Sequence, residues 1–218
     1  MRRIILTIVI LLALGKSYSS SYLSRTLTFN KSFIAGPNSL LDLGEQTKAL
    51  GFLKLKESYQ DKLGILKLYN KNGSVWLSFK FTDNFKSPLL NPLLFKSEDG
   101  ILVFDCISEN NDFYAVIVSK GNNIVKFIKK SDSNFLFQTW QQRILSMFSV
   151  DFDNKKNPLR ESPSAVSKKL HYSHNDFYHP VKINGNWLKV KSNDTNRTGW
   201  IKWRNDQGKV LIGLYDEA

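Results

Sequence analysis

The sequence predicts a mainly β protein in two parts, an N-terminal antiparallel β-meander domain with one helix and a small C-terminal β-barrel. Short apolar runs alternate with turn-forming residues over 51–130, as expected of strands joined by tight turns. Helical periodicity replaces this pattern near residue 140. Two tryptophan-containing runs within 185–204 are each led by glycine and joined by a polar loop, which is typical of a hairpin closing a small barrel. We therefore divide the mature chain into residues 20–150 and 151–218.

The predicted meander occupies residues 51–130 and has about five or six strands. The runs on either side of Asn72-Gly73 predict a hairpin, because Asn-Gly adopts positive φ angles at little cost. A polar turn at 108–112 joins a second pair of runs, whereas residues 85–99 contain two prolines and are predicted as a loop. The predicted strands lie, in chain order, at residues 62–69, 75–81, 101–107, 113–119 and 124–129.

Residues 134–150 predict an amphipathic helix of about three turns that covers one face of the meander. A final strand is the alternative. The polar stretch 151–158 then ends in Asn-Pro, which disfavours helix before the proline and predicts the boundary between the two parts. The apolar residues that give the helical spacing are Phe137, Trp140, Ile144, Leu145 and Phe148.

Side-chain alternation predicts the two faces of the C-terminal hairpin. Successive residues of a strand point to opposite sides of a sheet. Leu188, Val190 and Ile201 are therefore expected in the core of the barrel. Trp187 and Trp200 are expected on the far face, partly exposed to solvent.

Both ends of the C-terminal part carry a motif that resembles a known family. The stretch Leu159-Arg160-Glu161-Ser162-Pro163-Ser164 comes first, and the pattern Gly-x-Trp-x-Lys-Val, a short loop, and Gly-Trp-Ile follows within 185–201. Together they resemble the opening and the close of the bacterial Src-homology-3-like (SH3b) domains of exported proteins. The resemblance covers about residues 152–214 and departs at 168–180, where the family has a Gly-rich turn and a valine-rich strand. Residues 20–150 resemble no family known to us.

The SH3b resemblance implies a non-catalytic module that binds a cell-wall peptide or an envelope protein. Aromatic side chains beside a groove contact peptides and sugars with little ordering cost, and barrel edges can pair with an extended ligand. For each aromatic candidate the alternative is a purely structural role. The candidate ligand-binding residues are Tyr172, Tyr178, Trp187, Trp200 and Trp203.

Residues 1–19 predict a secretory signal peptide. Arg2 and Arg3 precede an apolar run at 4–14, which is too short for a membrane span of about 20 residues. Cleavage is expected after Ser19, with Gly15 as the alternative site, and an uncleaved membrane anchor is the alternative interpretation. The mature protein is then secreted or periplasmic, and has no transmembrane span.

The single cysteine, Cys106, lies in an apolar run that predicts a buried strand, and a secreted chain with one cysteine has no internal disulfide. A thiol hydrolase acting on the cell wall would need Cys106 beside a base such as His171 or His174. Such nucleophiles usually open a helix, where the dipole lowers the thiol pKa. We therefore expect no enzyme activity, and keep the hydrolase and an inhibitor or immunity-type protein as alternatives.

Three histidines, His171, His174 and His179, lie close together in the sequence, with Asp176 among them. The spacing of the first two could begin a metal site, with Asp176 as an oxygen ligand. No second cluster of cysteine or histidine follows to complete such a site. We therefore expect no metal and no cofactor.

The chain is basic, with a formal net charge of +12 from 31 Lys and Arg and 19 Asp and Glu. Removal of residues 1–19 takes away three basic and no acidic residues, so the mature chain has 28 against 19, or +9. This excess favours contact with anionic envelope surfaces. The lysines are scattered and often alternate with apolar residues, which is typical of a solvated strand face. We therefore expect no dedicated nucleic-acid surface, and a polyanion binder remains an alternative.

Overall fold

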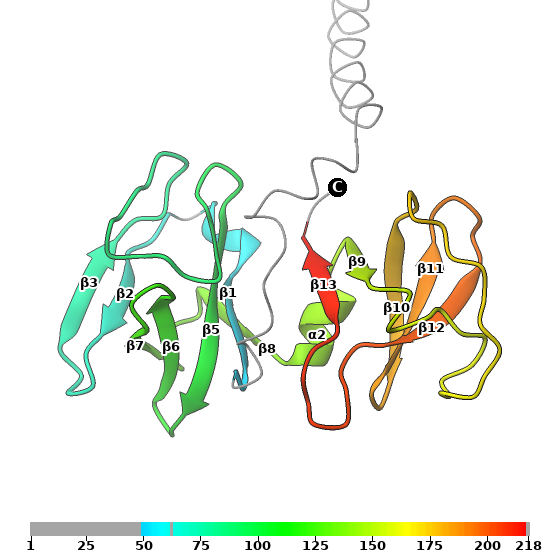
Figure 1. Cartoon of the computed structure of the whole chain (residues 1–218). Helices are drawn as coiled ribbons and strands as arrows, with labels where there is room; N and C mark the ends of the chain where they lie inside the picture. The colour runs from blue at the N-terminus through cyan, green and yellow to red at the C-terminus, as the bar shows by residue number, and fades with distance from the viewer. Residues whose placement is uncertain (1–48, 62, 217–218) are drawn as a thin grey trace, which may run out of the picture.

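A computed structural model describes residues 49–61 and 63–216, so the predicted signal peptide and residues 20–48 lie outside the described residues. The described part of the chain is mainly β, as predicted, with two antiparallel sheets and one short α-helix (Figure 1). Among the described residues, no helix has the length and apolar character needed to cross a membrane.

The first sheet has eight strands in the order β3-β2-β7-β6-β5-β1-β8, and β4 pairs with β5 outside this path. The predicted hairpins are confirmed, because β2 pairs with β3 and β5 pairs with β6, both antiparallel. A short 3-10 helix, η3 (Glu57–Tyr59), follows β1. The strands are β1 (Gly51–Leu55), β2 (Leu66–Tyr69), β3 (Val75–Phe79), β4 (Leu94–Lys96), β5 (Ile101–Glu109), β6 (Phe113–Ser119), β7 (Ile124–Lys129) and β8 (Phe135–Gln138). The strand β4 lies inside the segment predicted as a loop.

One face of this sheet encloses the first hydrophobic core. Cys106 of β5 is 0 % exposed there, as its apolar run predicted. In β2, exposed Lys67 separates two fully buried leucines, which is the alternation of a strand with one face in the core. The turn between β2 and β3 requires Gly73, whose φ is +82°.

The predicted three-turn helix at 134–150 is wrong in extent. This stretch instead forms β8, the helix α2 (Trp140–Leu145) and β9 (Ser149–Phe152). The strand β8 pairs with β1, so backbone bonding to a distant strand overrides the local helical spacing. The helix begins only at Thr139, whose hydroxyl accepts a hydrogen bond from the Gln142 N–H while the Gln142 side chain accepts one from Thr139 N–H.

The second sheet has five strands in the order β12-β11-β10-β9-β13. The predicted linker begins as a strand, because Asp151 and Phe152 belong to β9, which lies between β10 and β13. The tryptophan hairpin is confirmed as β11 paired with β12. A closed barrel was expected, yet within the described residues no ladder joins β12 to β13. The remaining strands are β10 (Tyr178–Asn184), β11 (Trp187–Ser192), β12 (Thr198–Lys202) and β13 (Ile212–Tyr215).

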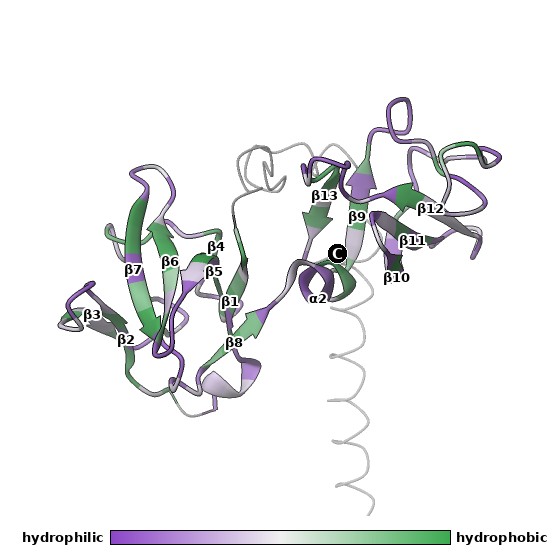
Figure 2. Ribbon diagram, turned by 90° about the horizontal axis from the view of Figure 1, so that it is seen from below, coloured by the Kyte–Doolittle hydropathy of each residue, from purple (hydrophilic) through white to green (hydrophobic). Residues whose placement is uncertain are grey.

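The helix α2 lies between the two sheets (Figures 1 and 2). Ile144 belongs to the second hydrophobic core, together with Leu188, Val190 and Ile201, whose burial confirms the predicted inner face. Trp140 contacts both sides through Phe52 of β1, at 4.7 Å between ring centroids, and Trp203, at 6.5 Å. The helix thus joins the two cores.

Candidate functional site

The outer face of β10, β11 and β12 is the candidate binding surface. The strand register places Lys182, Lys189 and Trp200 in one row across the three strands. The next row contains Trp187 and Lys202. Directly opposite residues share a face of the sheet, so these side chains lie on one side, away from the core.

The five aromatic candidates do not form one exposed surface. Trp203 is 1 % exposed and Tyr178 is 4 % exposed. Trp200 is 8 % exposed, so the prediction that it is partly exposed is wrong. Tyr172 and Trp187 are half-buried and retain accessible surface. Burial of the other three leaves little of each ring for a ligand to touch.

Two contacts from other parts of the chain accompany the burial of Trp200. The Lys182 ammonium lies 5.6 Å from the centroid of the Trp200 ring. Beyond β12, Arg160 exchanges two backbone hydrogen bonds with Trp200, at 2.9 and 2.8 Å, and extends the sheet by one bridge. The alternation rule correctly places Trp200 on the outer face of the sheet. It does not predict how deeply the Trp200 ring is buried there.

Tyr172 and Tyr178 stack on each other on the core side of the second sheet. Their ring centroids are 5.5 Å apart, and each ring meets Phe152 edge-on at 5.2 Å. Burial raises the pKa of Tyr172 to about 12, so its phenol stays neutral over the physiological range. These tyrosines stabilise the loop before β10, and Tyr178 Oη accepts a hydrogen bond from Ser173 N–H at 3.0 Å.

Trp203 is an anchor of the second core. Its indole N–H donates to the Gly185 carbonyl at 2.9 Å, and the Arg204 guanidinium lies 4.5 Å from its ring centroid. With Trp140 stacked on it, the Trp203 ring has neighbours that account for its burial. A structural role explains this residue fully.

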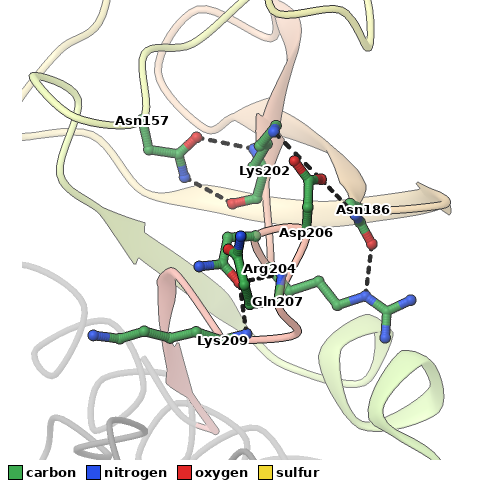
Figure 3. Close-up of polar contacts among 8 residues, drawn as sticks. Asn157, Asn186, Lys202, Arg204, Asp206, Gln207 and Lys209 are labelled. Atoms are coloured by element: carbon green, nitrogen blue, oxygen red, sulfur yellow. Dashed lines mark hydrogen bonds and ion pairs between the residues drawn. The ribbon is translucent and has the colours of Figure 1, made fainter.

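Trp187 is the accessible aromatic residue of the outer face. The Lys202 ammonium lies 5.8 Å from its ring centroid and 3.8 Å from a carboxylate oxygen of Asp206. The Asn157 side chain fixes the Lys202 backbone, because it accepts from Lys202 N–H at 2.9 Å and donates to its carbonyl at 2.7 Å (Figure 3). Asn186, next to Trp187, accepts from Arg204 Nε–H at 2.7 Å. These contacts hold both strand ends beside the ring.

The same outer face carries four lysines, Lys182, Lys189, Lys191 and Lys202, which we call the lysine strip. Lys182 lies directly opposite Lys189, and Lys191 follows Lys189 on the same side of β11. Of the four, Lys202 has a carboxylate partner, whereas no described carboxylate pairs with the other three. The surface therefore combines uncompensated positive charge with one accessible indole ring.

Sequence analysis did not single out these lysines as a site. It treated alternating lysines as the solvated face of a strand. The available signal was the spacing Trp187-x-Lys189-x-Lys191, which places all three side chains on one face. That Lys182 joins them follows only from the pairing of β10 with β11.

The remaining chemical candidates are separate from this surface. Burial, followed by the nearby Glu109 carboxylate, raises the pKa of the Cys106 thiol to about 12. His171 and His174 are exposed, whereas His179 Nδ1 is hydrogen-bonded to the Phe148 carbonyl. In the part of the chain that the structure describes, no three potential metal ligands lie together.

Comparison of this chain with known protein families, curated proteins and solved structures found no similar protein. No family model matches this chain, and neither a curated protein nor a solved structure matches it. The SH3b resemblance of residues 152–214 therefore stays a prediction.

Proposed function

We propose that this chain is an exported, non-catalytic binding protein whose C-terminal part recognises a cell-wall peptide. The observation that carries the proposal is the accessible Trp187 ring between Lys189 and Lys202 on the outer face of the second sheet. An indole ring offers a large apolar contact with few rotatable bonds, and the Lys189 ammonium, which has no described carboxylate partner, attracts the carboxylates of a peptide. The binding surface is thus smaller than the aromatic groove expected from the sequence, and it is centred on Trp187.

Two further observations support a binding role over thiol chemistry. Cys106 has no exposed surface, and its raised pKa keeps the thiol protonated, whereas a nucleophile must present a thiolate to its substrate. Export is part of the proposal because of the sequence pattern of residues 1–19. The alternative of an envelope protein partner is an outcome of the test below.

The test is retention of residues 20–218 on purified peptidoglycan, with Trp187→Ala as the variant. Trp76→Ala is a matched control, because Trp76 is a half-buried tryptophan on the first sheet with the Lys126 ammonium 4.8 Å from its ring centroid. We expect Trp187→Ala to lose retention while Trp76→Ala keeps it. Melting curves of both variants show whether each is folded.

Two results would contradict the proposal. The first is failure of the unaltered protein to bind peptidoglycan, together with capture of one discrete envelope protein at moderate salt, which would move the function to protein–protein interaction. The second is full retention of a folded Trp187→Ala variant, which would remove Trp187 from the site.

A further inference from the structure

We propose that the lysine strip binds the free carboxylates of the cell-wall stem peptide, so that charge on the peptide decides which walls are bound. This inference rests on the proposed function and names the chemistry of its ligand. It starts from Lys182 and Lys189, which lie directly opposite each other on β10 and β11. Like charges in that position destabilise a sheet, and a bound anion would offset this repulsion.

Other lysines of the chain show how such charge is usually compensated. Lys130 lies 2.5 Å from a Glu109 carboxylate oxygen, and Lys54 lies 3.5 Å from one of Glu57. No described carboxylate lies within ion-pair distance of Lys182, Lys189 or Lys191. Lys182 contacts the Trp200 ring, but none of the three lysines has a carboxylate partner within the described residues, and this uncompensated charge favours a ligand with more than one negative charge.

The spacing of the strip fits an extended peptide. Lys189 and Lys191 are two residues apart on β11, which separates their Cα atoms by about 6.7 Å. In the γ-linked stem peptide, five bonds separate the glutamyl Cα from the diaminopimelate Cα, which is about 6 Å when the chain is extended. The free carboxylates on these two atoms can therefore reach successive lysines. Lys182 adds a second donor beside Lys189, at the distance of a direct cross-strand pair.

Trp187 gives the strip a direction. It precedes Lys189 on the same face of β11, and its partner Lys202 is already close to Asp206. The uncompensated charge therefore lies toward Lys191, and the apolar contact lies at the other end. A peptide with an apolar end followed by carboxylates fits this order.

The experiment compares two probes by isothermal titration with residues 20–218. One probe is the stem tripeptide L-alanyl-γ-D-glutamyl-diaminopimelate with free carboxylates, and the other is the same peptide with its carboxylates amidated. We expect the amidated peptide to bind about tenfold more weakly or worse, because each lost charge-assisted contact removes a substantial part of the affinity.

Variants of single lysines test which side chains bind the carboxylates of the peptide. Lys189→Gln and Lys182→Gln are expected to weaken binding of the free-carboxylate peptide about tenfold. The control is Lys155→Gln, an exposed lysine of the loop after β9 that lies outside the strip. It is expected to leave the affinity within about twofold, since isolated surface charges contribute little.

The outcomes separate this inference from the proposed function. Equal binding of both peptides, or unchanged binding by folded Lys189→Gln, would contradict carboxylate recognition by the lysine strip. Either result would leave the proposed binding to the cell wall intact. Absence of binding to either peptide and to purified peptidoglycan would remove the proposed function itself. Binding of a glutamate-rich peptide in place of both stem peptides would overturn the assignment to the cell wall.

Discussion

The burial of Cys106 decides between two very different roles for its thiol. Its side chain lies in the first core on β5, and burial raises its pKa to about 12. We expect iodoacetamide to leave Cys106 unmodified in the folded protein at pH 8, because alkylation needs an accessible thiolate. In guanidinium chloride the same thiol should react fully, which mass spectrometry measures. Rapid labelling in the folded state would restore the thiol hydrolase alternative.

At the scale of residues, local alternation predicts which side of a strand a side chain occupies but not how deeply it is buried. Leu188, Val190 and Ile201 are placed correctly because the period of a strand is two residues. Trp200 is on the predicted side, yet it is buried, with Lys182 beside its ring and Arg160 paired to its backbone. Those contacts come from distant parts of the chain, so the alternation of side chains along β12 cannot predict them.

Gly199 also owes its role to a contact with a distant segment that the local sequence does not predict. In the sequence this glycine only leads a tryptophan-containing run, whereas the structure shows a close approach of another segment. A Cβ atom at this position would lie 2.7 Å from the Leu159 side chain and 3.1 Å from that of Leu170. The glycine is therefore required by packing against the segment that precedes β10, and only the folded structure brings that segment there.

At the scale of elements, the stretch 134–150 shows how strand pairing and capping divide a continuous helical pattern. β8 pairs with β1, which is distant in the chain, so the periodicity of the stretch alone could not reveal it. The start of α2 was visible in the sequence as Thr139-x-x-Gln142, the spacing of a capping box. The helix is short because the chain must leave β8 and enter β9 within a few residues.

The capping box predicts a measurable loss of stability. Thr139→Ala removes the hydroxyl that accepts the Gln142 N–H, and we expect the free energy of unfolding to fall by about 1 kcal/mol. Gln141→Ala is the control, because Gln141 is exposed on the same helix and has no role in the cap. Urea denaturation of the two variants measures the difference. An equal effect of both changes would show that the cap does not stabilise α2.

At the scale of the whole molecule, one buried ion pair joins α2 to the last described residues of the chain. Arg143 is 1 % exposed, and its Nη2 atom lies 2.6 Å from an Asp216 carboxylate oxygen. Asp105 of the first sheet is also buried and attracts the same guanidinium, while its own pKa is raised, chiefly by burial. One charge cluster thus contains a residue of the first sheet, a residue of the connecting helix and the residue that follows β13 of the second sheet. Their wide separation in the sequence hid this cluster from sequence analysis.

Loss of the arginine should therefore uncouple the two sheets. Arg143→Ala leaves Asp216 without its ion-pair partner and removes one of the two cations that act on buried Asp105, the other being Lys120. Removal of one member of a buried pair costs about 3–5 kcal/mol. We expect a lower Tm and, in calorimetry, two transitions where the unaltered protein shows one, since each sheet has its own hydrophobic core. Arg197→Ala, a change at an exposed arginine, should leave the single transition in place. An unchanged Tm for Arg143→Ala would mean that the contacts of Trp140 with Phe52 and Trp203 are sufficient to hold the sheets together.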